Sequence, residues 1–149
     1  MITYVNGDLL QSPAKVLVNP TNTVGVMGRG LAADFKRIYP EMFDQYRTLC
    51  ETRRLAVGQL HLYRTPHKWV LNFPIKKHWR EEVRLDDIEA GLQKFAAIYA
   101  DQGMTSVSFP AVEMGDTELN WRYKVRPLME AYLDPLPIMI YIHRVSETH

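Results

Sequence analysis

The chain has 149 residues, 46% of them hydrophobic and 23% charged, and its formal net charge of +1 argues against a protein that binds nucleic acid through a uniformly basic surface. The single cysteine, Cys50, excludes an internal disulfide and suits a reducing, intracellular compartment. We therefore expect one cytoplasmic domain over residues 1–149 with no membrane contact, since no apolar run approaches the roughly 20 residues that span a bilayer.

The first half of the chain alternates strand and helix patterns. Apolar runs predict strands over residues 1–5, 15–19, 59–63 and 69–73, with Pro74 expected to end the last of them. Apolar residues at helical spacing predict two further elements. One helix leads up to Pro40, and a second covers residues 41–52.

The second half continues the alternation. An amphipathic helix is expected between residues 84 and 102, stopped by Gly103, and is followed by a strand over 106–109, a helix over 121–133 and a strand over 138–143. This order predicts an α/β fold with a mainly parallel or mixed sheet and helices on both faces. Because ligands bind beyond the carboxyl ends of the strands in such folds, the candidate site lies in the loops over 7–8, 19–30, 74–84 and 110–120.

The second of these loops is rich in glycine and asparagine. Within VNPTNTVGVMGRGLAADF (residues 18–35), three glycines precede a helix, so that backbone N–H groups and the helix N-terminus can approach a phosphate. The spacing matches neither a P-loop nor the Rossmann fingerprint. Asn19 and Asn22, expected at the end of the strand, could bond ribose hydroxyls, and the alternative is a polar turn without a ligand.

Three stretches together resemble a macrodomain: GDLL after the first strand, VNPTNTVGVMGRGLAADFKRIYP, and NFPIKKHWREEVRLDDIEAGL. More narrowly, they are similar to the DarG type, which removes ADP-ribose from thymidine in DNA and is related to the terminal ADP-ribose protein glycohydrolases. The resemblance extends over essentially the whole chain. It implies a three-layer α/β/α fold with a central mixed sheet, ADP-ribose and ADP-ribosylated single-stranded DNA as partners, no cofactor or metal ion, and a monomer.

The resemblance also implies roles for individual residues. Asp8 would accept a hydrogen bond from adenine, Asn22 would face the terminal ribose, and the loop over 25–30 would wrap the diphosphate. Lys76 would be the essential catalytic residue, with Lys77 as its rival and two surface lysines as the plain alternative. The ADP-ribose ligands implied in this way are Asp8, Leu9, Asn19, Thr23, Gly25, Val26, Met27, Gly28, Gly30 and Gly115.

The stretch KKHWREEVR (residues 76–84) holds four basic side chains and a tryptophan. Basic residues interleaved with an aromatic ring suit single-stranded DNA, whose bases stack and whose phosphates pair with lysine or arginine. A solvated loop is the alternative. The expected nucleic-acid contacts are Lys77, His78, Trp79 and Arg80.

The loop FPAVEMGDTELNW (residues 109–121) departs from the DarG-type pattern, which is glycine-rich at this place, and retains only Gly115. Side chains at 113–118 restrict the backbone, and carboxylates there would repel a diphosphate. Either the loop is remodelled, with Asp116 as a third catalytic candidate beside Lys76 and Asn22, or the chain binds ADP-ribose without turnover. A hydrolase acting on ADP-ribosylated protein or O-acetyl-ADP-ribose is the other alternative. The five histidines show no metal-ligand spacing.

Overall fold

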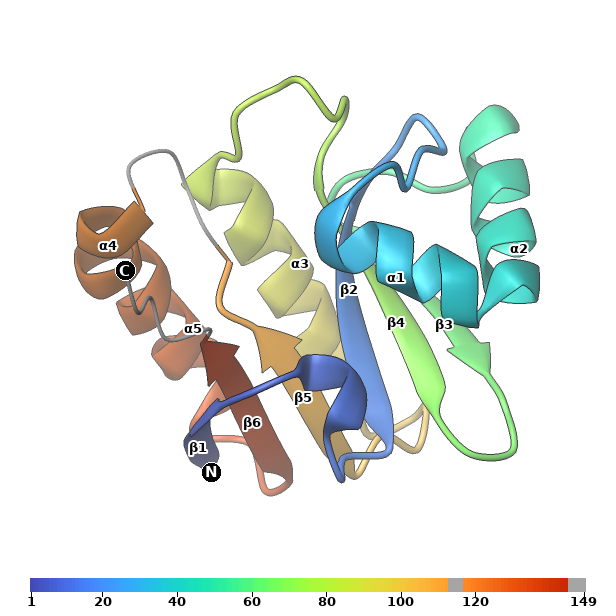
Figure 1. Cartoon of the computed structure of the whole chain (residues 1–149). Helices are drawn as coiled ribbons and strands as arrows, with labels where there is room; N and C mark the ends of the chain where they lie inside the picture. The colour runs from blue at the N-terminus through green and yellow to red at the C-terminus, as the bar shows by residue number, and fades with distance from the viewer. Residues whose placement is uncertain (113–116, 145–149) are drawn as a thin grey trace.

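The structure is a computed structural model that describes residues 1–112 and 117–144, leaving aside the side chains of residues 117 and 118. The strands within these residues are β1 (Ile2–Asn6), β2 (Val16–Asn22), β3 (His61–Arg64), β4 (Trp69–Lys76), β5 (Ser106–Pro110) and β6 (Met139–Arg144). They form one sheet in the order β1-β6-β5-β2-β4-β3 (Figure 1). All neighbours are parallel except β3, which runs antiparallel to β4, so the prediction of a mixed sheet is confirmed.

Helices cover both faces of this sheet (Figure 1). They are η1 (Leu9–Gln11), α1 (Gly30–Ile38), α2 (Pro40–Glu51), α3 (Leu85–Ile98), α4 (Thr117–Asn120), η2 (Trp121–Val125) and α5 (Arg126–Leu133). Because side chains alternate along a strand, Leu17 of β2 joins the core with α1 and α2, whereas Val16 and Val18 join the core with α3 and α5. The fold is therefore the three-layer α/β/α arrangement that the resemblance implied.

The helices expected from apolar spacing are present, with shifted ends. Pro40 separates α1 from α2 and stands in the first turn of α2, where its missing N–H is not needed. The helix expected up to residue 102 ends at Ile98, and Gly103 follows with a φ of +76°. The last helical segment begins at Thr117 rather than 121 and includes the π-helical turn η2. Within the described residues, none of the helices combines the length and apolar character needed to cross a membrane.

Two strands run further than the sequence predicts, because each continues through a proline. The strand expected to end at residue 19 continues through Pro20 to Asn22, and the strand expected to end at 73 continues through Pro74 to Lys76. Among the described residues, β5 pairs with β2 only at Val16 and Leu17, near the start of β2, and β3 pairs with β4 only as far as Asn72. Beyond those points each strand has one open side, where a proline without an N–H is tolerated.

The consequence is a two-stranded extension of the sheet. β2 and β4 pair with each other along their whole length, and the pairing ends with Asn22 opposite Lys76. The register shifts by one residue just before this pair. Both side chains are therefore held by regular backbone structure at the carboxyl edge of the sheet, and the loops begin only after them.

Candidate active site

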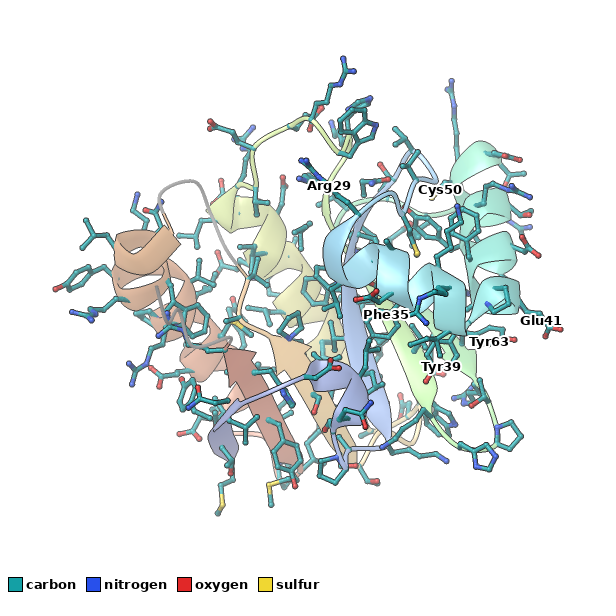
Figure 2. All side chains as sticks on the ribbon, viewed as in Figure 1. Arg29, Phe35, Tyr39, Glu41, Cys50 and Tyr63 are labelled. Carbon is teal, nitrogen blue, oxygen red and sulfur yellow. The ribbon has the colours of Figure 1, made fainter. Side chains whose placement is uncertain are left out.

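A cavity of about 440 Å³ opens at this extension of β2 and β4. Its volume lies within the range of small-molecule sites. Figure 2 shows Arg29 at the start of α1, on the edge of the sheet where the loop after β4 also lies. The lining residues are Pro20, Thr21, Asn22, Val26, Gly28, Arg29, Ala32, Ile75, Lys76 and Trp79. The cavity therefore joins the glycine-rich loop to the KKHW stretch, as expected from their positions after neighbouring strands.

Asn22 holds the glycine-rich loop in shape. Its Nδ2 donates to the Val26 carbonyl at 2.9 Å, and its Oδ1 accepts from the Val24 N–H at 3.1 Å and lies 2.9 Å from the Tyr46 hydroxyl. Burial, reinforced by the neighbouring Cys50, raises the pKa of Tyr46, which therefore remains protonated and able to donate. The amide carries two N–H donors, so one is left to face a ligand after the bond to Val26.

Lys76 is the last residue of β4 and is half-buried in the cavity wall. Among residues 1–112 and 117–144, no side chain or carbonyl forms a hydrogen bond or ion pair with its ammonium group. Lysine side chains usually extend into water. A half-buried, unpartnered amine at the end of a strand is available to a ligand in the cavity.

Lys77 lies on the other side of the same chain segment. Its carbonyl accepts hydrogen bonds from the Thr23 N–H at 3.1 Å and the Thr23 hydroxyl at 3.2 Å, which join the loops after β2 and β4. Its side chain lines a separate cavity together with His78. Of the two rival lysines, the structure thus brings only Lys76 to the cavity with Asn22.

Three side chains of the KKHWREEVR stretch stack on one another beside the cavity. The rings of His78 and Trp79 lie 5.3 Å apart and nearly parallel, and the Arg80 guanidinium lies 4.5 Å from the centre of the Trp79 ring. Trp79 is 39% exposed and lines the cavity. The ring therefore offers a partly open surface at the cavity mouth, next to a positive charge.

Several expected ligands lie in the protein interior instead. Asn19 is fully buried in the middle of β2, where its Nδ2 donates to Asn72 at 3.1 Å, because the strand continues three residues past it. Its expected position at the strand end is therefore wrong. Leu9 and Met27 are buried in the core that contains α1 and α2. These three side chains support the loops and leave the cavity surface to others.

The glycines divide into two groups. Gly28 lines the cavity, whereas Gly25 and Gly30 have φ values of +90° and +64°, which favour glycine, and turn the chain into and out of the loop. Gly25 also packs on α2, since a Cβ there would lie 3.5 Å from Arg47 and Cys50. Thr23 contributes the bonds to Lys77, and Val26 lies in the lining, 40% exposed.

Asp8 lies apart from the described cavity lining. It is exposed after β1, and its Oδ1 accepts a hydrogen bond from the Leu10 N–H at 3.0 Å, capping η1. Next to it, the Gly7 carbonyl lies 3.4 Å from His143 Nδ1, and the Ser108 hydroxyl lies 3.0 Å from His143 Nε2. Burial lowers the pKa of His143, although the Gly7 carbonyl and Asp8 act in the opposite direction.

The loop that departs from the DarG-type pattern is described only in part. Glu113, Gly115 and Asp116 lie outside the described residues, as does the side chain of Glu118. Within the described ranges, no group of three or more histidine, cysteine, aspartate or glutamate residues is arranged to hold a metal ion.

The main residue that sequence reasoning missed is Arg29. It lies between Gly28 and Gly30, inside the loop already singled out, and that position was a usable signal. Its guanidinium has no hydrogen-bond or ion-pair partner in the part of the chain that is described. With Lys76, it gives the cavity two free positive charges, which suits an anionic ligand.

Comparisons with known proteins agree with this site. A family model described as Macro domain matches residues 18–126. The chain is 39% identical over 136 residues to a Mycobacterium tuberculosis protein named DNA ADP-ribosyl glycohydrolase. That match covers 89% of this chain but 39% of the relative, so the chain spans well under half of that protein's length.

Solved structures match along nearly the whole chain. The macrodomain of Thermus aquaticus DarG superposes with a TM-score of 0.90 at 33% identity, covering 97% of this chain and 98% of that one. Thermosipho africanus DarTG in complex with ADP-ribose superposes with a TM-score of 0.90 at 32% identity, covering 99% of this chain and 42% of that one. The family model and these alignments show that the protein belongs to the macrodomain family, and within it to the DarG type.

Proposed function

We propose that residues 1–149 form one macrodomain that binds ADP-ribose and hydrolyses the N-glycosidic bond between ADP-ribose and thymidine in DNA. The observation that carries the proposal is Lys76, which is half-buried and unpartnered among the described residues, opposite Asn22 in the cavity wall. The relative named DNA ADP-ribosyl glycohydrolase and the related structure solved with ADP-ribose support the choice of ligand and reaction.

We assign the parts of ADP-ribose to the cavity by their chemistry. The diphosphate lies against Gly28 and Arg29, where a backbone without a Cβ, a guanidinium and the start of α1 all favour an anion. The distal ribose lies between Asn22 and Lys76. The adenine reaches beyond the cavity towards Asp8. The second carboxylate oxygen of Asp8 remains able to accept a hydrogen bond from the adenine amino group.

The reaction breaks the bond between the anomeric carbon of the distal ribose and the base nitrogen. Water supplies the oxygen that bonds to this carbon and the proton that is taken up by the nitrogen. Lys76 acts at the anomeric carbon, either by attacking it or by taking a proton from the water, and Asn22 orients the ribose. Asp116, which lies outside the described residues, is a further candidate for proton transfer.

The modified DNA approaches over the loop after β4. Trp79 stacks a base at the cavity mouth, and Lys77, His78 and Arg80 contact the strand, as a stacking surface flanked by positive charge does in single-strand binding. We propose that the protein acts as a monomer in the cytoplasm.

Lys76→Ala tests the assignment directly. An oligonucleotide carrying ADP-ribose on thymidine is incubated with the native chain, with Lys76→Ala and with Lys94→Ala, which removes an exposed lysine on α3 outside the cavity. We expect Lys76→Ala to lower kcat by about a hundredfold or more while retaining affinity for free ADP-ribose, and Lys94→Ala to behave like the native chain. Equal release by the native chain and Lys76→Ala would remove Lys76 from the mechanism.

The same assay separates the alternatives. The native chain is also given ADP-ribosylated peptide and O-acetyl-ADP-ribose, and calorimetry measures its binding of ADP-ribose. Release from peptide or acetyl ester alone would identify a different hydrolase. Binding of ADP-ribose without any release would identify a recognition module, which the loss of glycines over 113–118 favours.

A further inference from the structure

A second cavity, also of about 440 Å³, lies beside the first and takes no part in the ADP-ribose binding or the bond cleavage proposed above. We call it the Arg53 cavity. Figure 2 shows Cys50, which forms part of its wall, at the same edge of the sheet as Arg29. Its lining residues are Thr23, Val24, Cys50, Arg53, Leu55, Ala56, Val57, Lys77, His78 and Glu81.

The two cavities share one wall. The segments over 22–24 and 76–78 lie side by side, joined by the hydrogen bonds from Thr23 to the Lys77 carbonyl. Asn22 and Lys76 line the first cavity, and the residues next to them in sequence line the Arg53 cavity. A ligand held at Lys76 can therefore extend over these two chain segments into the Arg53 cavity.

The lining of the Arg53 cavity combines apolar surface with positive charge. Leu55, Ala56 and Val57 follow α2 along one side, and Val24 is 43% exposed on the other. In the described part of the chain, the side chains of Arg53 and Lys77 have no hydrogen-bond or ion-pair partner. Among the described lining residues, Glu81 is the only carboxylate beside these cations and His78. Apolar surface beside cations suits a nucleotide, with its base on the former and its phosphate on the latter.

The backbone of Arg53 gives a second reason to assign it a function. Arg53 has a φ of +57° and is the only non-glycine residue of the described ranges with a positive φ. It follows the end of α2, where the Arg53 N–H bonds the Cys50 carbonyl at 3.1 Å and the Arg54 N–H bonds the Leu49 carbonyl at 2.7 Å. This is the Schellman arrangement, in which glycine is preferred at the position of Arg53. An arginine there strains the fold, and such strain is concentrated at functional sites.

We propose that the Arg53 cavity binds the nucleotide next to the ADP-ribosylated thymidine on the same single strand, with Arg53 and Lys77 on its phosphate. This inference rests on the proposed function, and it makes the enzyme selective for modified DNA strands over smaller ADP-ribosylated molecules. ADP-ribose itself occupies the first cavity and does not reach Arg53.

Arg53→Gly separates binding from stability. It removes the guanidinium, which should weaken binding, and it relieves the strain of the positive φ, which should not lower stability. Arg53→Asn is a second variant, since asparagine also tolerates this conformation. Each is assayed with an ADP-ribosylated single-stranded oligonucleotide and with ADP-ribosylated thymidine nucleoside. We expect KM for the oligonucleotide to rise about three- to tenfold, with KM for the nucleoside and affinity for free ADP-ribose unchanged.

Two further measurements distinguish a phosphate contact from a structural role. The slope of log KM for the oligonucleotide against log salt should decrease by about 0.7 in Arg53→Gly, as expected for one lost contact to a single strand. The thermal midpoint of Arg53→Gly should be equal to or above that of the native chain. Lys94→Ala, which removes the same charge from α3, should change neither KM nor the slope.

An unchanged oligonucleotide KM in both Arg53 variants would overturn the inference, as would an equal rise for oligonucleotide and nucleoside. If the native chain binds but does not hydrolyse either substrate, the proposed reaction fails. Equilibrium binding of the same two molecules then tests the Arg53 cavity by the same comparison. A further outcome is that the native chain prefers ADP-ribosylated peptide to the oligonucleotide. If Arg53→Gly abolishes that preference, the inference is overturned in favour of a protein substrate.

Discussion

Asn22 shows how a single side chain can support a whole loop. One amide bonds the backbone of Val24 and Val26 and meets the Tyr46 hydroxyl from α2. The turn that follows β2 therefore does not depend on glycine flexibility alone. Asn22 also lines the cavity, so the group that shapes the loop is the group we place against the distal ribose.

Asn22→Ala should therefore affect stability and binding together. Loss of the amide leaves the Val24 N–H and the Val26 carbonyl without these bonds, and the Tyr46 hydroxyl keeps only the Asn22 carbonyl as its acceptor, which together costs about 1–3 kcal/mol. We expect a fall of about 2–10 °C in the thermal midpoint for a chain of this size, and weaker binding of ADP-ribose by calorimetry. Tyr46→Phe removes the two bonds from this hydroxyl to Asn22 but keeps the bonds of the amide to Val24 and Val26 and the cavity lining, so it should lower the midpoint less. A variant Asn22→Ala that melts with the native chain would show that the loop is held by other contacts.

His61, which is half-buried, and His143, which is buried, should make the stability of the fold depend on pH. His61 Nδ1 accepts a hydrogen bond from Asn72 Nδ2 at 3.0 Å, and burial lowers the pKa of His61, as it does for His143. A histidine in the unfolded chain has a pKa of about 6.5. Below that pH the unfolded chain binds more protons than the folded one, so the free energy of unfolding falls as the pH decreases.

The measurement is urea unfolding at a series of pH values between neutrality and mild acid. We expect the free energy of unfolding to be highest above the unfolded histidine pKa and to decrease steadily below it. His61→Gln should make this decrease shallower, since the glutamine cannot take up a proton. A native stability that is constant across the series would contradict the assignment of neutral histidines in the fold.

At the scale of elements, the contact between α3 and β4 is unusually close. Gly91 of α3 lies directly over the Phe73 ring, and a Cβ at position 91 would overlap the ring atoms. Phe73 is three residues before Lys76 on the same strand. The glycine in the EAGL stretch therefore sets how closely the helix approaches the strand that carries Lys76.

Gly91→Ala should destabilise the fold although alanine favours helices. We expect a loss of about 1–3 kcal/mol from overpacking, measured by urea unfolding. The double variant Gly91→Ala with Phe73→Leu should recover part of the loss, because the smaller side chain makes room for the methyl group. Additive effects of the two substitutions would contradict a direct contact.

The prolines of β2 and β4 are the second lesson at this scale. The apolar patterns located both strands correctly, but a proline in the sequence predicts the end of a strand. Whether it ends a strand depends on whether the neighbouring strand still pairs at that point. That depends on the lengths of β3 and β5, which are distant in the sequence from Pro20.

Over the whole molecule, the net charge of +1 leaves room for individual cations without an ion-pair partner. Arginines on helices pair with carboxylates of the same helix, such as Arg47 of α2 with Asp44 and Glu51. The cations around the two cavities have no such partner within the described residues, and they are Arg29, Arg53, Lys76 and Lys77. Four cations without an ion-pair partner among the described residues thus lie around the two cavities, where anionic ligands would bind.

Binding of ADP-ribose should stabilise the whole fold, and the shift should report on Arg29. At a concentration a hundredfold above Kd, a ligand adds about 2.7 kcal/mol, or about 5–11 °C for a chain of this size. Arg29→Ala at the same concentration should show a clearly smaller shift in a thermal melt, because a guanidinium bond to phosphate is lost. Lys94→Ala is again the control. An undiminished shift in Arg29→Ala would place the diphosphate elsewhere.

The sequence alone determined the family, the α/β class, the order of the elements and four candidate loops, two of which line the described cavity, because these depend on local patterns and on contiguous motifs. Only the tertiary structure placed Lys76 and Lys77 in different cavities, moved Asn19 from the end of its strand into the buried middle and brought Arg53 beside Thr23 and Lys77. The physical reason is strand pairing. The pairing of β2 with β4 fixes which side of each segment faces a cavity, and it brings together residues that are far apart in the chain.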